Sequence, residues 1–132
     1  MPKGSCCCGA VRFELSEAPT MMATCHCSRC RKVGAATFVF VNRAAFSLTS
    51  GGGIIAQYEP EEGYRYVRSF CSVCGTALGE IGGGGDNFPI PANCFDEPLD
   101  LQVKFHEFVA EKPDWLQICD DARQFPHHPV AA

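Results

Sequence analysis

Cysteine thiols are the side chains of this chain best suited to chemistry. There are ten cysteines among 132 residues. Seven of them fall into three short groups: the C-x-C pair Cys6 and Cys8, the C-x-C-x-x-C run of Cys25, Cys27 and Cys30, and the C-x-x-C pair Cys71 and Cys74. Cys7, Cys94 and Cys119 are left over. Cysteines at these spacings are typical zinc ligands.

Disulfides are the other common reason for abundant cysteine. They persist in oxidising compartments, which a protein reaches through a secretion signal. The segment Met1 to Cys6 lacks the apolar run of such a signal, and no stretch approaches the length of a membrane span. We therefore expect a cytoplasmic protein with no membrane partner, whose clustered cysteines are metal ligands or catalytic thiols.

The spacings suit a tetrahedral metal site. A C-x-x-C motif forms a tight turn in which both sulfurs reach one ion, about 2.3 Å from zinc. Gly75, directly after Cys74, can supply the positive φ that such a turn commonly requires. The two side chains of a C-x-C motif in an extended strand point to the same face, because the strand repeat is two residues.

Counting ligands leaves two arrangements open. In the first, the pairs Cys6/Cys8 and Cys71/Cys74 close a structural four-cysteine site. The run of Cys25, Cys27 and Cys30 then binds a second zinc with an open fourth position, which is the pattern of a catalytic zinc. In the second, Cys27/Cys30 and Cys71/Cys74 form an ordinary zinc ribbon, and Cys6 and Cys8 stay free.

Other chemically capable residues have simpler interpretations. His26 alternates with Cys25 and Cys27, so a strand-like backbone points its ring away from their metal. His106 lies in an alternating segment and is expected to be structural or a hydrogen-bond partner near the site. Trp115 is expected in the core. Cys94 and Cys119 are expected to be buried thiols, since free cysteine behaves as a small apolar residue.

The notable basic cluster is Arg29, Arg31 and Lys32. It is either a solvated turn or a charged surface that offsets the negative three-thiolate site and attracts an anionic substrate. The net charge of −4 gives no reason to expect nucleic acid as a partner.

Short β-strands are the elements that must position these groups. A hydrophobic content of 46% and a charged content of 20% are typical of globular proteins and exclude disorder. We expect one mainly β domain over residues 1–132, with short antiparallel strands and an extended tail from about residue 124. Strands are predicted at 11–15, 37–41, 54–58, 64–70 and 101–108. Helix is limited to a turn or two after Cys27 and a short piece near Pro113.

The motifs and their flanking residues resemble the glutathione-dependent formaldehyde-activating enzyme family, which is related to centromere-protein-V-like proteins. They are Gly4-Ser5-Cys6-x-Cys8-Gly9, Cys25-His26-Cys27-Ser28-x-Cys30-Arg31-Lys32, Arg68-x-Phe70-Cys71-x-x-Cys74-Gly75, Phe95-Asp96-x-Pro98, His106 and Trp115. The resemblance covers nearly the whole chain. It implies a β-tent-like fold and the first ligand arrangement, with Cys6, Cys8, Cys71 and Cys74 structural and Cys25, Cys27 and Cys30 on a catalytic zinc.

The resemblance also implies an activity, the condensation of glutathione with formaldehyde to S-(hydroxymethyl)glutathione, formally a carbon–sulfur lyase reaction. The expected partners are a small thiol and an aldehyde. The leading alternative is a non-catalytic zinc module that binds a protein through the same fold. A reductase using Cys94 or Cys119 is disfavoured, because neither cysteine has a partner nearby in sequence.

Overall fold

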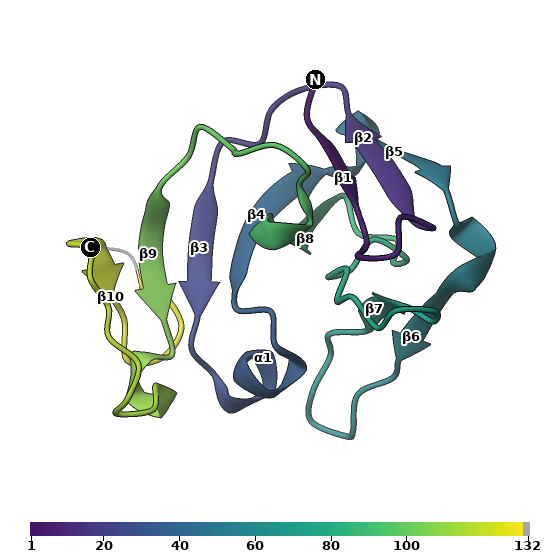
Figure 1. The fold of residues 1–132 in the computed structure, drawn as a ribbon. Coiled ribbons are helices and arrows are strands. Elements are labelled where there is room, and N and C mark those ends of the chain that lie inside the picture. The colour runs from purple at the N-terminus through teal and green to yellow at the C-terminus, as the bar shows by residue number, and fades with distance from the viewer. Residues whose placement is uncertain (131–132) are drawn as a thin grey trace.

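Short β-strands arranged in three sheets dominate the structure, a computed structural model that describes residues 1–130 (Figure 1). The strands are β1 (Lys3–Ser5), β2 (Arg12–Leu15), β3 (Met22–Cys25), β4 (Thr37–Asn42), β5 (Phe46–Ser50), β6 (Ile55–Tyr58), β7 (Arg68–Cys71), β8 (Asn87–Pro91), β9 (Val103–Glu107) and β10 (Arg123–Gln124). The α-helix of the described chain is α1 (Ser28–Val33), with short 3-10 turns at Arg43–Ala45, Gly52–Ile54, Ala92–Cys94 and Val109–Glu111. The prediction of a mainly β fold with little helix is confirmed.

The sheets differ in size and direction. One has the order β1-β2-β5 and another pairs β6 with β7, both antiparallel. The largest has the order β10-β9-β3-β4-β8. In it, β9 runs parallel to β3 and β10 runs parallel to β9, so the expectation of antiparallel strands fails for these two pairs. The parallel pairing brings the carboxyl ends of β3 and β9 to one edge, where Cys25 is opposite Glu107.

All five predicted strands form, and those expected over 64–70 and 101–108 are shorter than predicted. The alternating 11–15 segment becomes β2, in which Phe13 and Leu15 are buried while Arg12 and Glu14 are exposed. The strand expected over 64–70 begins only at Arg68. Tyr64 and Tyr66 are exposed in a loop, so the alternation of aromatic and basic residues there does not mark a buried face.

The apolar core is packed around the inner faces of the three-stranded and five-stranded sheets. Its largest fully buried side chains include Phe13, Leu15, Leu78, Phe88 and Ile90. Burying each such side chain stabilises the fold by about 1.5–3 kcal/mol. Cys6, Cys71 and Cys94 belong to the same cluster. Cys6 and Cys71 also belong to the cysteine groups of the sequence, so part of a candidate metal site is packed into the core.

The C-terminal third departs from expectation at three points. No α-helix forms near Pro113; instead, Lys112 Nζ donates hydrogen bonds to the carbonyls of Pro113 and Leu116, 3.3 and 2.7 Å away, and the segment is a turn. Trp115 is 76% exposed rather than in the core. Cys119 is also exposed, whereas Cys94 is buried as predicted.

The tail from about 124 is partly a strand, since Gln124 pairs with His106 at the sheet edge. Within residues 1–130, no helix has the length and apolarity required to cross a membrane.

Candidate metal sites

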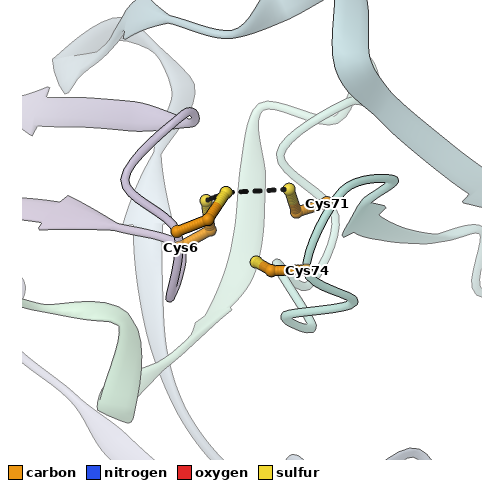
Figure 2. A group of neighbouring side chains, drawn as sticks. Cys6, Cys71 and Cys74 are labelled. Atoms are coloured by element: carbon orange, nitrogen blue, oxygen red, sulfur yellow. Dashed lines mark hydrogen bonds between the residues drawn. The ribbon is translucent and has the colours of Figure 1, made fainter.

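Four cysteine sulfurs from two distant turns meet beside the core (Figure 2). Cys6 and Cys8 come from the turn between β1 and β2, Cys71 ends β7, and Cys74 lies in the turn that follows it. All four sulfurs lie within 4.8 Å of one another, and Cys8 Sγ is 3.6 Å from Cys6 Sγ and 3.9 Å from Cys71 Sγ. Sulfurs placed tetrahedrally around one zinc are about 3.8 Å apart. This four-cysteine group therefore fits a closed zinc site.

Local hydrogen bonding shapes both turns. The Gly9 N–H donates to the Cys6 carbonyl at 3.0 Å, and the Gly75 N–H donates to the Cys71 carbonyl at 2.8 Å. Both glycines have positive φ, 78° and 79°, as expected after a knuckle. The Cys7 N–H donates to Thr76 Oγ1 at 2.9 Å, which joins one turn to the other. The Cys7 side chain is exposed and is not among the four grouped sulfurs.

The second group contains three sulfurs. Cys25 ends β3, Cys27 is the N-cap of α1, and Cys30 is a buried residue within that helix. Their ligand atoms also lie within 4.8 Å of one another. The Cys30 N–H donates to Cys27 Sγ at 3.3 Å, so a thiol takes the capping role that serine or aspartate usually has.

The structure separates the two groups as the first predicted arrangement expects. Cys71 and Cys74 lie with Cys6 and Cys8, so the zinc-ribbon alternative, which joined them to Cys27 and Cys30, is not the arrangement observed. Among residues 1–130, no fourth His, Cys, Asp or Glu completes the three-cysteine group. Three thiols at this spacing fit a zinc ion that keeps one position free.

Hydrogen bonding within the three-cysteine group favours a thiolate at Cys27. Hydrogen bonds from the side chains of Cys25 and Cys30 lower the pKa of Cys27 to about 2. The same contacts raise the pKa of Cys25. Metal binding requires deprotonated thiols. Of the three thiols, Cys27 is therefore the one that ionises first.

Arg68 contacts the three-cysteine group from another sheet. Its Nη1 and Nη2 atoms donate to Cys30 Sγ at distances of 3.8 and 3.7 Å. We did not predict this role from sequence, where Arg68 is only a residue of the third motif. The sequence does show a cation three residues before Cys71. The 38-residue separation between Arg68 and Cys30 hides the contact.

A buried histidine pair lies on the other side of the ligand loop. His26 Nε2 is 2.8 Å from His106 Nδ1, and His106 Nε2 is 3.1 Å from both carboxylate oxygens of Asp120. The ring of His26 is stacked on that of His106 with 5.0 Å between centroids. His26 thus lies outside the group of sulfurs, and the interpretation of His106 as a hydrogen-bond partner near the site is confirmed. Burial lowers the pKa of His26.

The basic cluster divides into one engaged residue and two exposed ones. Arg29 Nη2 is 2.8 Å from Glu61 Oε2 and 3.1 Å from the Tyr58 hydroxyl, and its guanidinium lies over the Tyr64 ring. Arg31 and Lys32 are exposed in the last turn of α1. Arg29 therefore holds the loop after β6 against the helix, while the other two remain available to a solute.

Comparison with known proteins identifies the family. The family model described as glutathione-dependent formaldehyde-activating enzyme matches residues 1–111. A Halomonas elongata protein named "Putative glutathione-dependent formaldehyde-activating enzyme" is 32% identical over 128 residues, covering 88% of this chain and 80% of that protein. A crystal structure of a Rhodobacter sphaeroides protein shares the fold, with a TM-score of 0.59, 22% identity, and coverage of 74% of this chain and 91% of that chain. With the cysteine groups described above, these matches show that the chain belongs to the glutathione-dependent formaldehyde-activating enzyme family.

Proposed function

We propose that this chain is a zinc-dependent enzyme that condenses glutathione, or a similar small thiol, with formaldehyde to give S-(hydroxymethyl)glutathione. In this proposal Cys6, Cys8, Cys71 and Cys74 hold a structural zinc, and Cys25, Cys27 and Cys30 hold a catalytic one. The activity is of the carbon–sulfur lyase type, and the working compartment is the cytoplasm. Residues 1–132 act as one domain.

The observation that carries the proposal is that, among residues 1–130, no fourth protein ligand joins the three-cysteine group. A structural zinc site is closed by four protein ligands, whereas a catalytic one keeps a position for water or substrate. The chain contains both patterns in one fold. The family match and the name of the Halomonas elongata relative supply the substrate class.

The reaction joins the thiol sulfur to the aldehyde carbon, and the carbonyl oxygen receives the proton that the thiol loses. A bound zinc would supply a lowered pKa for a thiol and a Lewis acid for the aldehyde. The chain's own residues place the substrates. Arg31 and Lys32, exposed on α1, can attract the carboxylates of glutathione by long-range electrostatics.

A cavity of about 160 Å³ lies next to Arg68, which contacts Cys30 of the three-cysteine group. It is lined by residues of α1, the loop after it, β6 and β7, among them Val33, Ala35, Tyr58, Arg68 and Phe70. Such a volume is below the usual range of pockets for drug-sized ligands, about 300–1,000 Å³. In this proposal the cavity admits the thiol and aldehyde ends of the substrates, and the remainder of glutathione stays outside it.

Direct observation of the product tests the proposal. Formaldehyde and glutathione also combine without an enzyme, so the rate of S-(hydroxymethyl)glutathione formation should be followed by NMR exchange spectroscopy with and without the zinc-loaded protein. We expect a rate above the spontaneous background that disappears in Cys27→Ser. A rate equal to the background would contradict the enzyme and favour the alternative, a zinc module that binds another protein.

A further inference from the structure

Arg68 is a half-buried cation held against a sulfur rather than a carboxylate. It begins β7, three residues before Cys71, and both of its terminal nitrogens donate to Cys30 Sγ. Among residues 1–130, no carboxylate oxygen lies within 4.0 Å of its guanidinium. A guanidinium that is removed from water without a carboxylate partner requires another negative group. Glu80 interacts with Arg68 electrostatically at longer range, and the three-cysteine group is the negative group that Arg68 contacts directly.

The charge of the site explains what Arg68 can do. Zn²⁺ with three thiolates carries a formal charge of −1, and a fourth thiolate would make the charge −2. Accumulating negative charge in a partly buried site is unfavourable unless a cation is nearby. Arg68 returns the formal total to −1 when a fourth thiolate is present.

We propose that Arg68 is the specificity-determining residue of the three-cysteine site, which it biases toward an anionic thiolate over a neutral fourth ligand. This inference rests on the proposed function, because it assumes that a thiol reaches the open position. The thiol binds as thiolate, and its proton leaves to solvent. Arg68 also lines the cavity beside the site, so it is accessible to a ligand that enters there.

The fold gives Arg68 this place through the other cysteine group. Cys71 at the end of β7 belongs to the four-cysteine group, and the strand pairs with β6 along its length, from Arg68 opposite Tyr58 to Cys71 opposite Ile55. The four-cysteine group thus fixes the end of β7, and the first residue of this strand contacts the three-cysteine group. The two sites are connected by one short strand.

Arg29 provides a matched control. It is also close to the three-cysteine group in sequence, but its guanidinium is satisfied by Glu61 and Tyr58 and lies over Tyr64. Within the described chain, its guanidinium donates no hydrogen bond to a sulfur. Removing the charge at Arg29 changes the charge of the same region without changing the contact to Cys30.

The experiment is a ligand titration of the cobalt-substituted protein, in which a new thiolate-to-cobalt charge-transfer band reports a thiol ligand and a change in the cobalt d–d bands reports either kind of fourth ligand. Wild type, Arg68→Gln, Arg68→Lys and Arg29→Gln are titrated with glutathione, with 2-mercaptoethanol and with imidazole. In Arg68→Gln we expect both thiols to bind about tenfold more weakly and imidazole to bind within about twofold of wild type. Arg68→Lys should recover most of the thiol affinity, and Arg29→Gln should match wild type with 2-mercaptoethanol.

Three results would overturn the proposal: equal thiol affinity in Arg68→Gln and wild type, equal losses for thiol and imidazole, or no thiol-induced band in wild type. If Arg68→Gln does not fold, Arg68→Lys decides, because a loss of thiol preference in this charge-conserving variant contradicts a charge effect. Failure of the proposed function has a different signature. A wild-type protein that binds thiols with the expected Arg68 dependence but forms no product would contradict the enzyme and leave the Arg68 proposal standing.

Discussion

Both cysteine groups offer sulfur as the ligand atom, but they differ in the backbone segments that supply the cysteines. The four-cysteine group joins two tight turns that are 63 residues apart at Cys8 and Cys71, and two of its cysteines are buried in the core. The three-cysteine group comes from one short segment at the end of β3 and the start of α1. In the proposed function, zinc in the four-cysteine group stabilises the fold, while zinc in the three-cysteine group keeps a coordination position for chemistry. The difference between them predicts different consequences of mutation.

Removing a ligand of the four-cysteine group should have the largest effect on stability. We expect Cys71→Ser to lower the melting temperature by more than roughly 10 °C, because structural zinc contributes on the order of 10 kcal/mol to the folded state. Differential scanning calorimetry measures this shift. Cys7→Ser is the control, since Cys7 is exposed between two of the grouped cysteines and lies outside the group. Equal melting temperatures for the two variants would contradict a stabilising role.

Removing a ligand of the three-cysteine group should affect activity more than stability. We expect Cys27→Ser to reduce the product-formation rate about a hundredfold while the melting temperature falls by only a few degrees. Serine retains an oxygen that can accept the capping hydrogen bond from the Cys30 N–H. Cys119→Ser, at an exposed cysteine outside both groups, should leave both quantities unchanged. A collapse of stability as large as that of Cys71→Ser would remove the distinction between the groups.

Mutation of the His26–His106 pair should lower the stability of the fold and weaken metal binding at the three-cysteine site alone. Replacing buried His106 with leucine leaves His26 without its hydrogen-bond partner, and we expect a loss of roughly 2 kcal/mol in the free energy of unfolding. Urea denaturation measures this loss, and exposed His127→Asn is the control. Because His26 lies between Cys25 and Cys27, chelator competition should show weaker metal binding at the three-cysteine site only. Equal weakening at both sites would point to a general loss of structure.

The smallest effect is expected at the loop that Arg29 holds. Glu61 is exposed, and the Tyr58 hydroxyl and the Arg29 guanidinium help to lower its pKa to about 2. We expect Glu61→Gln to leave the urea midpoint unchanged, since solvent screens exposed ion pairs. The released Arg29 should lower KM for glutathione by no more than about twofold. Steady-state kinetics test this expectation, and a large change in kcat would place the loop in the reaction itself.

Local pattern was enough to predict the groups but not their surroundings. The spacing of Cys25, Cys27 and Cys30, and the glycine after Cys74, indicate turns whose geometry depends on few residues. The alternation in 11–15 likewise predicts β2, because period-two burial is a local property.

Contacts between distant segments were not predictable in this way. His26 meets His106 across 80 residues, and this pairing depends on the parallel placement of β9 beside β3. Arg68 meets Cys30 only because β7 is brought beside α1. Trp115 shows the converse error: an aromatic residue was expected in the core, but the turn fixed by Lys112 leaves it exposed.

The central claim is that the chain has two separate and unequal cysteine sites, and zinc stoichiometry tests it most directly. Zinc per chain should be measured by mass spectrometry of metal content in wild type, in Cys6→Ser/Cys8→Ser and in Cys27→Ser/Cys30→Ser. We predict two ions in wild type and one in each double variant, with added glutathione perturbing only the ion that remains when Cys27 and Cys30 are intact. One ion in wild type, or a single ion lost in both variants, would contradict the account.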